Sequence, residues 1–320
     1  MPQPPDRSHI ATEQRNPRSM NLHALSIAEC VRLIHEEDRA VLAAMEAARP
    51  ALTSFIEAVE PRFLTGGRLI YIGAGTSGRL GVLDASEAPP TFQLEEGRIV
   101  GLIAGGDSSL RKSSEGKEDD PNGAAADLAA LQLTPNDTVL GIAAGGTTPY
   151  VLGALELAKR SFTTPRSPAP NILPSSVPLS ALLVCSPIEK PPAADHLIVL
   201  NTGPEVLTGS TRMKAGTATK LALNTISTTL MVRSGRVYEN LMVDVRATNA
   251  KLRDRAARII STLTSLPRDQ SFDLLDRADG SVKTAIVMHR RGVSREQAET
   301  LLHHAAGRLH AALSQSTESP

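Results

Sequence analysis

The residues that point most clearly to chemistry form a glycine-rich loop, Gly73-Ala-Gly-Thr-Ser-Gly, which directly follows an apolar run. A strand that passes through such a loop into a helix aims backbone N–H groups and the helix dipole at one place, which suits an anion. The hydroxyls of Thr76 and Ser77 favour a terminal phosphate over a dinucleotide. The dinucleotide loop and a plain turn with a serine N-cap remain the alternatives. The binding residues that this loop predicts are Gly75, Thr76, Ser77, Gly78 and Arg79.

Two further loops repeat the combination of glycine and hydroxyl residues. In Ala144-Gly-Gly-Thr-Thr-Pro-Tyr150, either Thr147 or Thr148 can cap the helix that Pro149 begins. In Leu207-Thr-Gly-Ser-Thr-Arg-Met-Lys-Ala-Gly-Thr217, a helix is expected from Thr211 onward, and cations in its first turn oppose the helix dipole unless an anion is bound. The alternatives are a capped helix and a solvated surface. The binding residues predicted here are Thr147, Thr148, Ser210, Thr211 and Lys214.

Two glutamates are candidates for acid–base chemistry. Glu87 follows the helix that leaves the first loop, and Glu118 lies in the acidic stretch Ser113-Ser-Glu-Gly-Lys-Glu-Asp-Asp. Taken singly, an acid near a helix start usually only complements the dipole or faces solvent. A phosphate-binding loop with two carboxylates nearby, however, indicates an enzyme acting on a phosphorylated small molecule.

The elements that must position these residues alternate between strand and helix. The strands are expected at Arg68–Gly73, Ile99–Ala104, Thr138–Ala143, Ala181–Cys185 and His196–Leu200. The helices between them are expected at Ser77–Ala85, Glu118–Leu131 and Tyr150–Arg160. This alternation predicts an α/β fold with a parallel sheet, buried on both faces. Ligands bind at the carboxyl edge of such a sheet, where the small-residue loops lie.

The flanking regions predict helices and an N-terminal arm. Residues 1–20 read as a mobile polar arm, followed by two helices, Ser26–Arg49 and Ala51–Phe63, separated by Pro50. The sugar-phosphate domain is expected to span residues 21–265, and a small helical tail domain, of the UBA-like kind, residues 266–320. The stretch 163–179 holds five prolines and is read as a surface insertion.

Composition excludes several classes of protein. Lys and Arg together number 34, as do Asp and Glu, so no net field favours nucleic acid or an anionic membrane. There is no Trp, with three Tyr and five Phe, which leaves few stacking platforms for bases. The two cysteines lie far apart and read as reduced thiols, which predicts a cytoplasmic protein. The eight histidines show no metal-binding spacing, and neither a metal nor a cofactor is predicted.

Taken together, the motifs resemble those of the N-acetylmuramic acid 6-phosphate etherase family, whose sugar-isomerase (SIS) domain is related to glucokinase regulatory protein. The resemblance runs from about Thr12 to the tail. It rests on the segments 12–19 (Thr-Glu-Gln-Arg-Asn-Pro-Arg-Ser), 73–80 (Gly-Ala-Gly-Thr-Ser-Gly-Arg-Leu), 84–87 (Asp-Ala-Ser-Glu), 115–119 (Glu-Gly-Lys-Glu-Asp), 209–217 (Gly-Ser-Thr-Arg-Met-Lys-Ala-Gly-Thr) and 240–245 (Asn-Leu-Met-Val-Asp-Val).

The resemblance implies a doubly wound, three-layer sheet of the flavodoxin-like kind. It also implies a lyase that removes D-lactate from N-acetylmuramic acid 6-phosphate, leaving N-acetylglucosamine 6-phosphate, in the recycling of cell-wall amino sugars. The family's two acids fall on Glu87 and Glu118. One departure is Gly145, where the family usually has serine, which removes one hydroxyl from the expected phosphate site.

The expected reaction is an elimination followed by addition of water, and Glu87 poses a geometric problem for it. Ten residues of helix span about 15 Å, so a Glu87 carried by the helix that starts near Ser77 stands too far along to serve the phosphate at its own loop. The sequence therefore predicts a homodimer with a shared site. The alternatives are a non-catalytic sugar-phosphate regulator, an aldose–ketose phosphate isomerase, and a dinucleotide enzyme.

Overall fold

The computed structural model describes residues 6–112, 115–160, 177–245 and 249–314. Within these residues, the main sheet is parallel, with the strand order β2-β1-β3-β4-β5. Its strands are β1 Leu69–Gly73, β2 Ile99–Ile103, β3 Thr138–Ile142, β4 Leu179–Val184 and β5 His196–Val199. This order confirms the doubly wound, flavodoxin-like α/β fold, and it places the ends of β1 and β3 side by side at the carboxyl edge.

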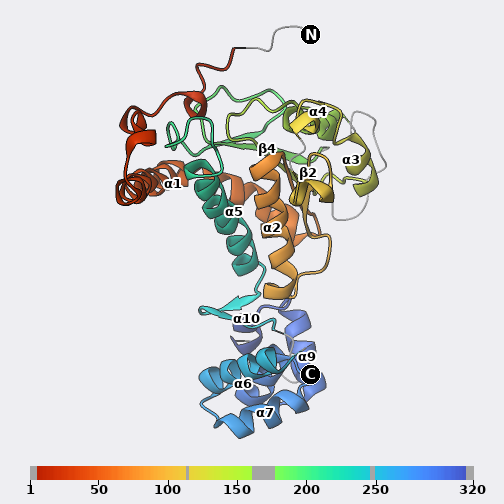
Figure 1. Cartoon of the computed structure of the whole chain (residues 1–320). Helices are drawn as coiled ribbons and strands as arrows, with labels where there is room; N and C mark the ends of the chain where they lie inside the picture. The colour runs from red at the N-terminus through yellow and green to blue at the C-terminus, as the bar shows by residue number, and fades with distance from the viewer. Residues whose placement is uncertain (1–5, 113–114, 161–176, 246–248, 315–320) are drawn as a thin grey trace. The chain divides into compact units, whose positions relative to one another are not determined.

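Helices cover both faces of this sheet, so the fold has three layers (Figure 1). Ile70 and Val139 point to one face, where they pack with residues of α3 (Ala125–Leu131) and α4 (Pro149–Arg160). Tyr71 points to the other face because side chains alternate along a strand, and it contacts α2 (Gly75–Phe92). All residues of β1 and β3 are buried, which explains why these runs are continuously apolar in sequence.

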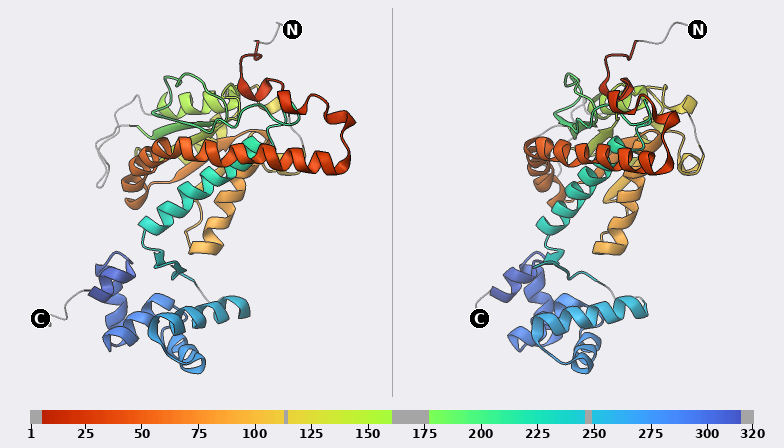
Figure 2. Two further views of the ribbon diagram at one scale, coloured as in Figure 1. Left: turned by 90° about the vertical axis from the view of Figure 1, so that its left-hand side faces the viewer. Right: turned by 60° about the vertical axis from the view of Figure 1, so that its left-hand side comes forward.

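A single helix, α1 (Ile27–Leu64), stands where the sequence predicted two helices separated by Pro50. Figure 2 shows it as one long helix, coloured red to orange. Residues on both sides of the proline, such as Ala48 and Leu52, are buried, and the helix packs on β4 and β5. The predicted break was wrong because burial along the helix outweighs the one backbone hydrogen bond that the proline removes.

Two other helix boundaries differ from the predictions. Helix α2 does not end at Ala85 but continues through Pro89 and Pro90 to Phe92. Helix α3 begins only at Ala125, so Glu118 lies in a turn before it rather than in its first turn.

The chain divides into two compact units, and each is described separately. The first unit comprises residues 1–87 and 96–227, and the second comprises residues 88–95 and 228–320. Helix α5 (Lys214–Arg233) runs up to and past the last boundary. The remaining elements are β6 Val237–Tyr238, β7 Leu241–Met242, α6 Ala250–Thr264, α7 Arg268–Arg277, α8 Val282–Arg291, α9 Arg295–His304 and α10 Leu309–Ser314.

The helical tail is therefore larger than the expected span 266–320. Ile260 of α6 shares a buried core with Leu275 of α7 and Ala285 of α8, so α6 belongs with the tail helices. The last two helices of this unit, α9 and α10, contribute to the same core. A core common to all of these helices explains why the second unit begins before residue 266.

The N-terminal residues that the structure describes are not a free arm. Ile10, Thr12 and Asn16 are buried against the first unit, and short 3₁₀ turns connect them to α1. The mobile-arm prediction is wrong for this part because hydrogen bonds and an apolar contact hold it. Residues 1–5 lie outside the described residues, as do positions 163–176 of the proline-rich stretch. No helix among the described residues is long and apolar enough to cross a membrane.

Candidate active site

Loop 1 (Gly73–Gly78) joins β1 to α2, and its glycines have different tasks. A Cβ on Gly78 would stand 2.6 Å from the Gly73 carbonyl oxygen, so the helix can dock closely on the strand only without that atom. Gly75 begins α2 with a φ of +52°, and no described atom lies within 4 Å of the Cβ it lacks. Thr76 and Ser77 follow in the first helical turn, whose N–H groups have no intrahelical acceptor. Loop 1 therefore presents an open helix N-terminus.

Loop 3 (Leu207–Thr217) contacts loop 1. The methyl group of Thr76 lies 3.5 Å from the position of a Cβ on Gly216, and the Thr211 carbonyl oxygen lies 3.3 Å from that same position. Ser210 and Thr211 are partly exposed there. The structure thus brings together two of the three predicted binding loops.

The N-terminus of the helix after loop 3 already has an acceptor from the protein. Helix α5 begins at Lys214, not at the predicted Thr211. The fully buried carboxylate of Glu205 accepts the N–H groups of Lys214 and Ala215 at 3.1 and 2.9 Å. Burial raises the pKa of Glu205 above its ordinary value, and these two hydrogen bonds oppose the rise. The Glu205 carboxylate therefore occupies the N-terminus of α5. What loop 3 can present to a ligand is the pair of hydroxyl groups of Ser210 and Thr211, not an unoccupied helix N-terminus.

The charge of Lys214 also has a protein partner. Its Nζ lies 2.7 Å from Oε2 of Glu37, and both side chains are buried. Asn16 donates to the same carboxylate at 2.6 Å, and Arg18 lies 3.0 Å from its other oxygen. Burial raises the pKa of Glu37, but the hydrogen bonds from Lys214 and Asn16 outweigh burial and hold it below the ordinary value. The sequence expectation explained the cation at position 214 by a bound anion, whereas the structure supplies Glu37 as the counter-charge.

Loop 2 (Ala144–Tyr150) joins β3 to α4, which starts at Pro149 as predicted. Thr147 and Thr148 are partly exposed just before it. The N–H of Tyr150 donates to the Glu118 carbonyl oxygen at 3.0 Å. This bond ties Glu118 to loop 2, which stands at the carboxyl edge beside loop 1.

Glu87, in contrast, is exposed in the fourth turn of α2, ten residues beyond Ser77. At 1.5 Å per residue, this is about 15 Å along the helix. The structure therefore does not bring Glu87 to the loop 1 of its own helix. Nearby Asp84 is buried and accepts hydrogen bonds from Tyr71 (2.9 Å) and Asn224 (2.7 Å), which fixes α2 to β1 and α5.

Arg79 donates hydrogen bonds to the loop that follows β2. Its Nε donates to the Leu110 carbonyl oxygen at 3.2 Å, and a terminal nitrogen donates to that of Lys112 at 3.4 Å. This predicted binding residue therefore holds the loop after β2 against α2. Among the described residues, no group of three or more His, Cys, Asp and Glu side chains could hold a metal ion.

Sequence reasoning missed Thr12, Asn16, Glu37 and Glu205 as parts of this region. One signal was available: Glu37 falls between Leu33 and Val41 at helical spacing, which places an acid on the buried stripe of α1. A buried acid requires a partner.

The chain is similar to several known proteins. Residues 51–159 match the family model described as the glucokinase regulatory protein N-terminal SIS domain. The chain is 49% identical over 311 residues to an N-acetylmuramic acid 6-phosphate etherase of Prochlorococcus marinus, covering 96% of this chain and 93% of that protein. It is 47% identical to one of Crocosphaera subtropica, covering 96% of both. The chain belongs to the N-acetylmuramic acid 6-phosphate etherase family. Loops 1, 2 and 3 are thus features of an etherase-family chain with an SIS domain.

A solved structure of phosphoheptose isomerase GmhA from Neisseria gonorrhoeae is also similar to this etherase-family chain. The identity is 15%, the TM-score is 0.44, and the match covers 64% of this chain and 98% of that one.

Proposed function

We propose that this chain cleaves the D-lactyl ether of N-acetylmuramic acid 6-phosphate, as its family name describes. Loop 1 binds the phosphate through the open N-terminus of α2 and the hydroxyls of Thr76 and Ser77. Loops 2 and 3 add the hydroxyls of Thr147, Thr148, Ser210 and Thr211. The products are N-acetylglucosamine 6-phosphate and D-lactate.

The chemistry follows from the ring-opened sugar, whose aldehyde acidifies the proton on C2. One carboxylate, which we assign to Glu118, removes this proton, and the resulting enolate expels lactate from C3. Glu87 as an acid protonates the leaving oxygen and then, as a carboxylate, takes a proton from the water that adds to C3. Reprotonation of C2 completes the reaction, so one water is consumed overall.

The observation that carries this proposal is the meeting of loops 1 and 3 at Thr76 and Gly216, with Glu118 tied to loop 2 beside them. Incubation with N-acetylmuramic acid 6-phosphate and an enzymatic assay for D-lactate test it. In deuterated buffer, Glu87→Gln should lose lactate release and retain some exchange at C2. Full lactate release by that variant removes Glu87 from the mechanism.

Two alternatives predict no lactate. A sugar-phosphate regulator would bind the substrate unchanged, and an aldose–ketose phosphate isomerase would interconvert sugar phosphates. A wild-type chain that binds the sugar phosphate without releasing lactate supports the regulator. The dinucleotide alternative predicts nicotinamide binding, which a fluorescence titration measures.

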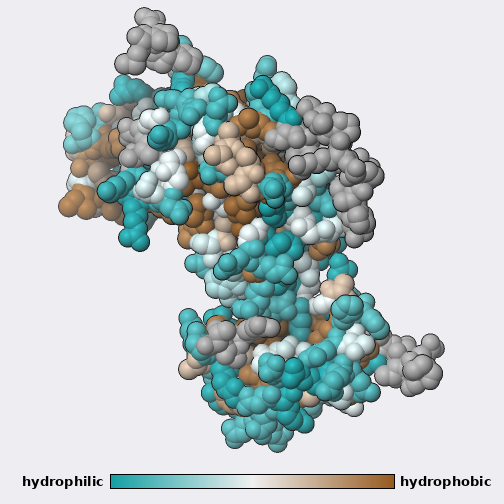
Figure 3. Space-filling model, turned by 90° about the vertical axis from the view of Figure 1, so that its right-hand side faces the viewer, coloured by the Kyte–Doolittle hydropathy of each residue, from teal (hydrophilic) through white to brown (hydrophobic). Residues whose placement is uncertain are grey.

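We further propose a homodimer in which Glu87 serves the site of the other copy. The length of α2 between Ser77 and Glu87 supports it, since a hexose phosphate is shorter from phosphorus to C3. The first unit also exposes an apolar stripe on α1, where Ile27, Val31 and Leu42 share one face and are exposed by 85%, 48% and 70%. Figure 3 shows hydrophobic residues on one face of the first unit, whereas the second unit is mostly hydrophilic in that view.

Mixing two inactive variants tests the shared site. In a heterodimer of Glu87→Gln and Glu118→Gln, one of the two sites regains both acids if Glu87 comes from the partner. Co-refolding equal amounts should restore about a quarter of the wild-type rate, because half of the dimers are mixed and each has one intact site. No restoration places both acids in one chain and contradicts the sharing. Light scattering gives the mass of the assembly.

We also propose a cytoplasmic location. Both cysteines are free thiols, and burial raises the pKa of Cys185 to about 12, as expected for an unreactive structural thiol in a reducing compartment.

A further inference from the structure

The N-terminal segment Ile10–Asn16 contacts the loops at the carboxyl edge of the sheet. The N–H of Ala11 donates to Ser186 Oγ at 2.9 Å, two residues after β4. The Thr12 carbonyl oxygen accepts the N–H of Gly209 in loop 3 at 3.2 Å. The segment is therefore seated beside the loops proposed to bind the sugar phosphate.

The hydroxyl of Thr12 has no hydrogen-bond partner among the described residues, although the side chain is fully buried. Its oxygen lies 3.6 Å from the position that a Cβ on Gly145 would take. Because position 145 has no side chain, the hydroxyl faces the backbone of loop 2, a proposed site loop. Leaving a buried hydroxyl unpaired costs about 1–3 kcal/mol. This cost, together with the position of Thr12 beside loops 2 and 3, points to a partner that arrives with the ligand.

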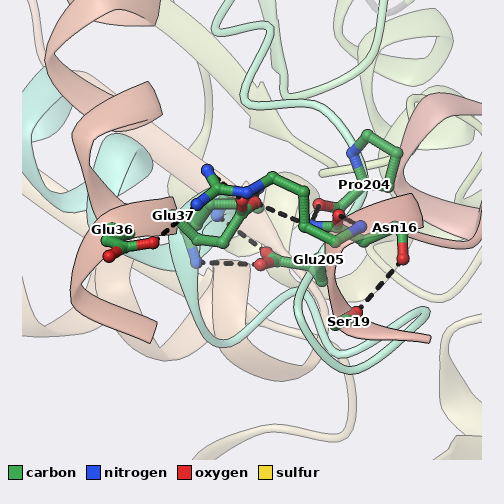
Figure 4. A network of polar contacts seen from close by, with 9 residues as sticks. Asn16, Ser19, Glu36, Glu37, Pro204 and Glu205 are labelled. Atoms are coloured by element: carbon green, nitrogen blue, oxygen red, sulfur yellow. Dashed lines mark hydrogen bonds and ion pairs between the residues drawn. The ribbon is translucent and has the colours of Figure 1, made fainter. Parts of the chain in front are cut away.

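A buried network holds the segment in place. Asn16 donates to Glu37 at 2.6 Å and to the Pro204 carbonyl oxygen at 3.2 Å. Lys214 donates to Glu37 at 2.7 Å from the start of α5. Figure 4 shows Asn16, Glu37, Pro204 and Glu205 gathered around these contacts. One carboxylate thus joins the N-terminal segment, α1 and the helix that follows loop 3.

We propose that the segment Ile10–Asn16 is a wall of the sugar-phosphate site, that the Thr12 hydroxyl bonds the bound substrate, and that the Glu37–Lys214 pair anchors this wall. The proposal rests on the proposed function and adds residues to it. The wall must shift slightly when substrate enters, because the hydroxyl is covered in the free chain. Lys214 is then a positioning residue that acts through Glu37, not a phosphate ligand.

Thr12→Val tests the wall, because it replaces the hydroxyl by a methyl group of similar size. We expect its KM for N-acetylmuramic acid 6-phosphate to rise about tenfold, which corresponds to ~1.4 kcal/mol of binding. Its unfolding midpoint should equal or exceed that of the wild type, since an unpaired buried hydroxyl is removed. Thr12→Ser keeps the hydroxyl and should restore KM.

Thr138→Val is the matched control. The Thr138 hydroxyl is also fully buried and unpartnered among the described residues, but it lies at the first residue of β3, on the opposite edge of the sheet. We expect the KM of Thr138→Val to stay within twofold of the wild-type value. An unchanged KM in Thr12→Val, or an equal rise in both variants, overturns the wall.

The anchor is tested with Glu37→Gln, Lys214→Met and the double variant, which removes both charges of the pair and leaves Glu205 held by its two backbone N–H donors. A positioning role predicts that both single variants raise KM by the same factor and that the double variant raises it no further. If KM rises in Lys214→Met but not in Glu37→Gln, the Lys214 ammonium binds substrate directly. This result overturns the proposal that the Glu37–Lys214 pair anchors the wall.

The outcome for the wild-type chain separates this inference from the proposed function. If the wild type releases no lactate, the proposed function fails. If it releases lactate and Thr12→Val has the wild-type KM, only the wall fails. Calorimetric titration with N-acetylglucosamine 6-phosphate repeats the comparison of variants without requiring turnover.

Discussion

Loops 1 and 3 look alike in sequence, but the helix N-termini that follow them differ in whether the protein supplies a carboxylate there. Both combine glycines with adjacent hydroxyl residues ahead of a helix. In loop 1, α2 begins at Gly75, where a Cβ would meet open space, and its first N–H groups have no intrahelical acceptor. In loop 3, the carboxylate of Glu205 already accepts the first N–H groups of α5. A helix start binds an external anion only if the protein has not supplied its own.

The comparison assigns the two loops different tasks. Under the proposed function, loop 1 holds the phosphate, whereas loop 3 presents hydroxyls whose position depends on the Glu205 carboxylate and on the Glu37–Lys214 pair. The one cation in the first turn of α5, Lys214, is explained by Glu37 and Glu205 without a ligand. The same sequence pattern can therefore describe a binding site or a structural cap.

The largest expected effect comes from Glu205→Ala, which removes the cap of α5. The N–H groups of Lys214 and Ala215 would then be buried without their acceptor. We expect the free energy of unfolding to fall by about 3 kcal/mol, because each bond to a charged acceptor contributes ~1.5–3 kcal/mol. Urea denaturation followed by circular dichroism measures it. A negligible loss would mean that the helix after loop 3 is as open as that after loop 1.

Ser77→Ala and Ser210→Ala compare the loops directly in substrate binding. Loss of a hydrogen bond to a phosphate oxygen, worth ~2 kcal/mol, should raise KM about 30-fold in Ser77→Ala. Ser210→Ala should raise it by about threefold at most. Both serines are partly exposed, so the unfolding midpoints should stay near that of the wild type. Equal increases in KM in the two variants would contradict the claim that loops 1 and 3 contribute differently to substrate binding.

Gly75→Ala tests whether loop 1 depends on its backbone conformation. The φ of +52° should make this change cost about 1 kcal/mol of stability. Gly145→Ala is the control, since a Cβ there would meet only ordinary contacts at 3.4 Å or more. Chemical denaturation should show a lower free energy of unfolding for Gly75→Ala only. A similar decrease in both variants would contradict the argument that the backbone at position 75 is strained by a side chain.

The smallest expected effect is the pH dependence that Glu37 gives to loop 3. Its folded pKa lies below the ordinary value of 4.5, so its stabilisation is complete above that pH and is lost as pH falls through the folded value. The stability difference between wild type and Glu37→Gln should therefore shrink on acidification. Denaturation curves at several pH values measure it. A difference that grows in acid would reverse the assigned sign.

Much of the fold could be predicted because its signals are local. Apolar runs give the strands, and small residues mark their carboxyl ends, so the sheet and loop 1 follow from short segments. The break at Pro50 was wrong because what decides it, the burial of α1 against β4 and β5, involves contacts that are distant in sequence.

The candidate site was less predictable for the same reason. Glu37 and Lys214 are 177 positions apart, and no local pattern pairs them. Thr12 read as part of a mobile arm because a polar, proline-containing segment has no periodicity to reveal where it docks. The position of Glu87 along α2 could be estimated because it depends only on helical rise.

The buried bonds between Asp84 and the side chains of Tyr71, Asn224 and Ser227 have a consequence for evolution. Because these bonds hold α2 to the core one turn before Glu87, the position of that acid depends on side chains inside the fold. If Glu87 acts as proposed, substitutions at these interior positions alter the reaction, so the interior and the reaction must diverge together.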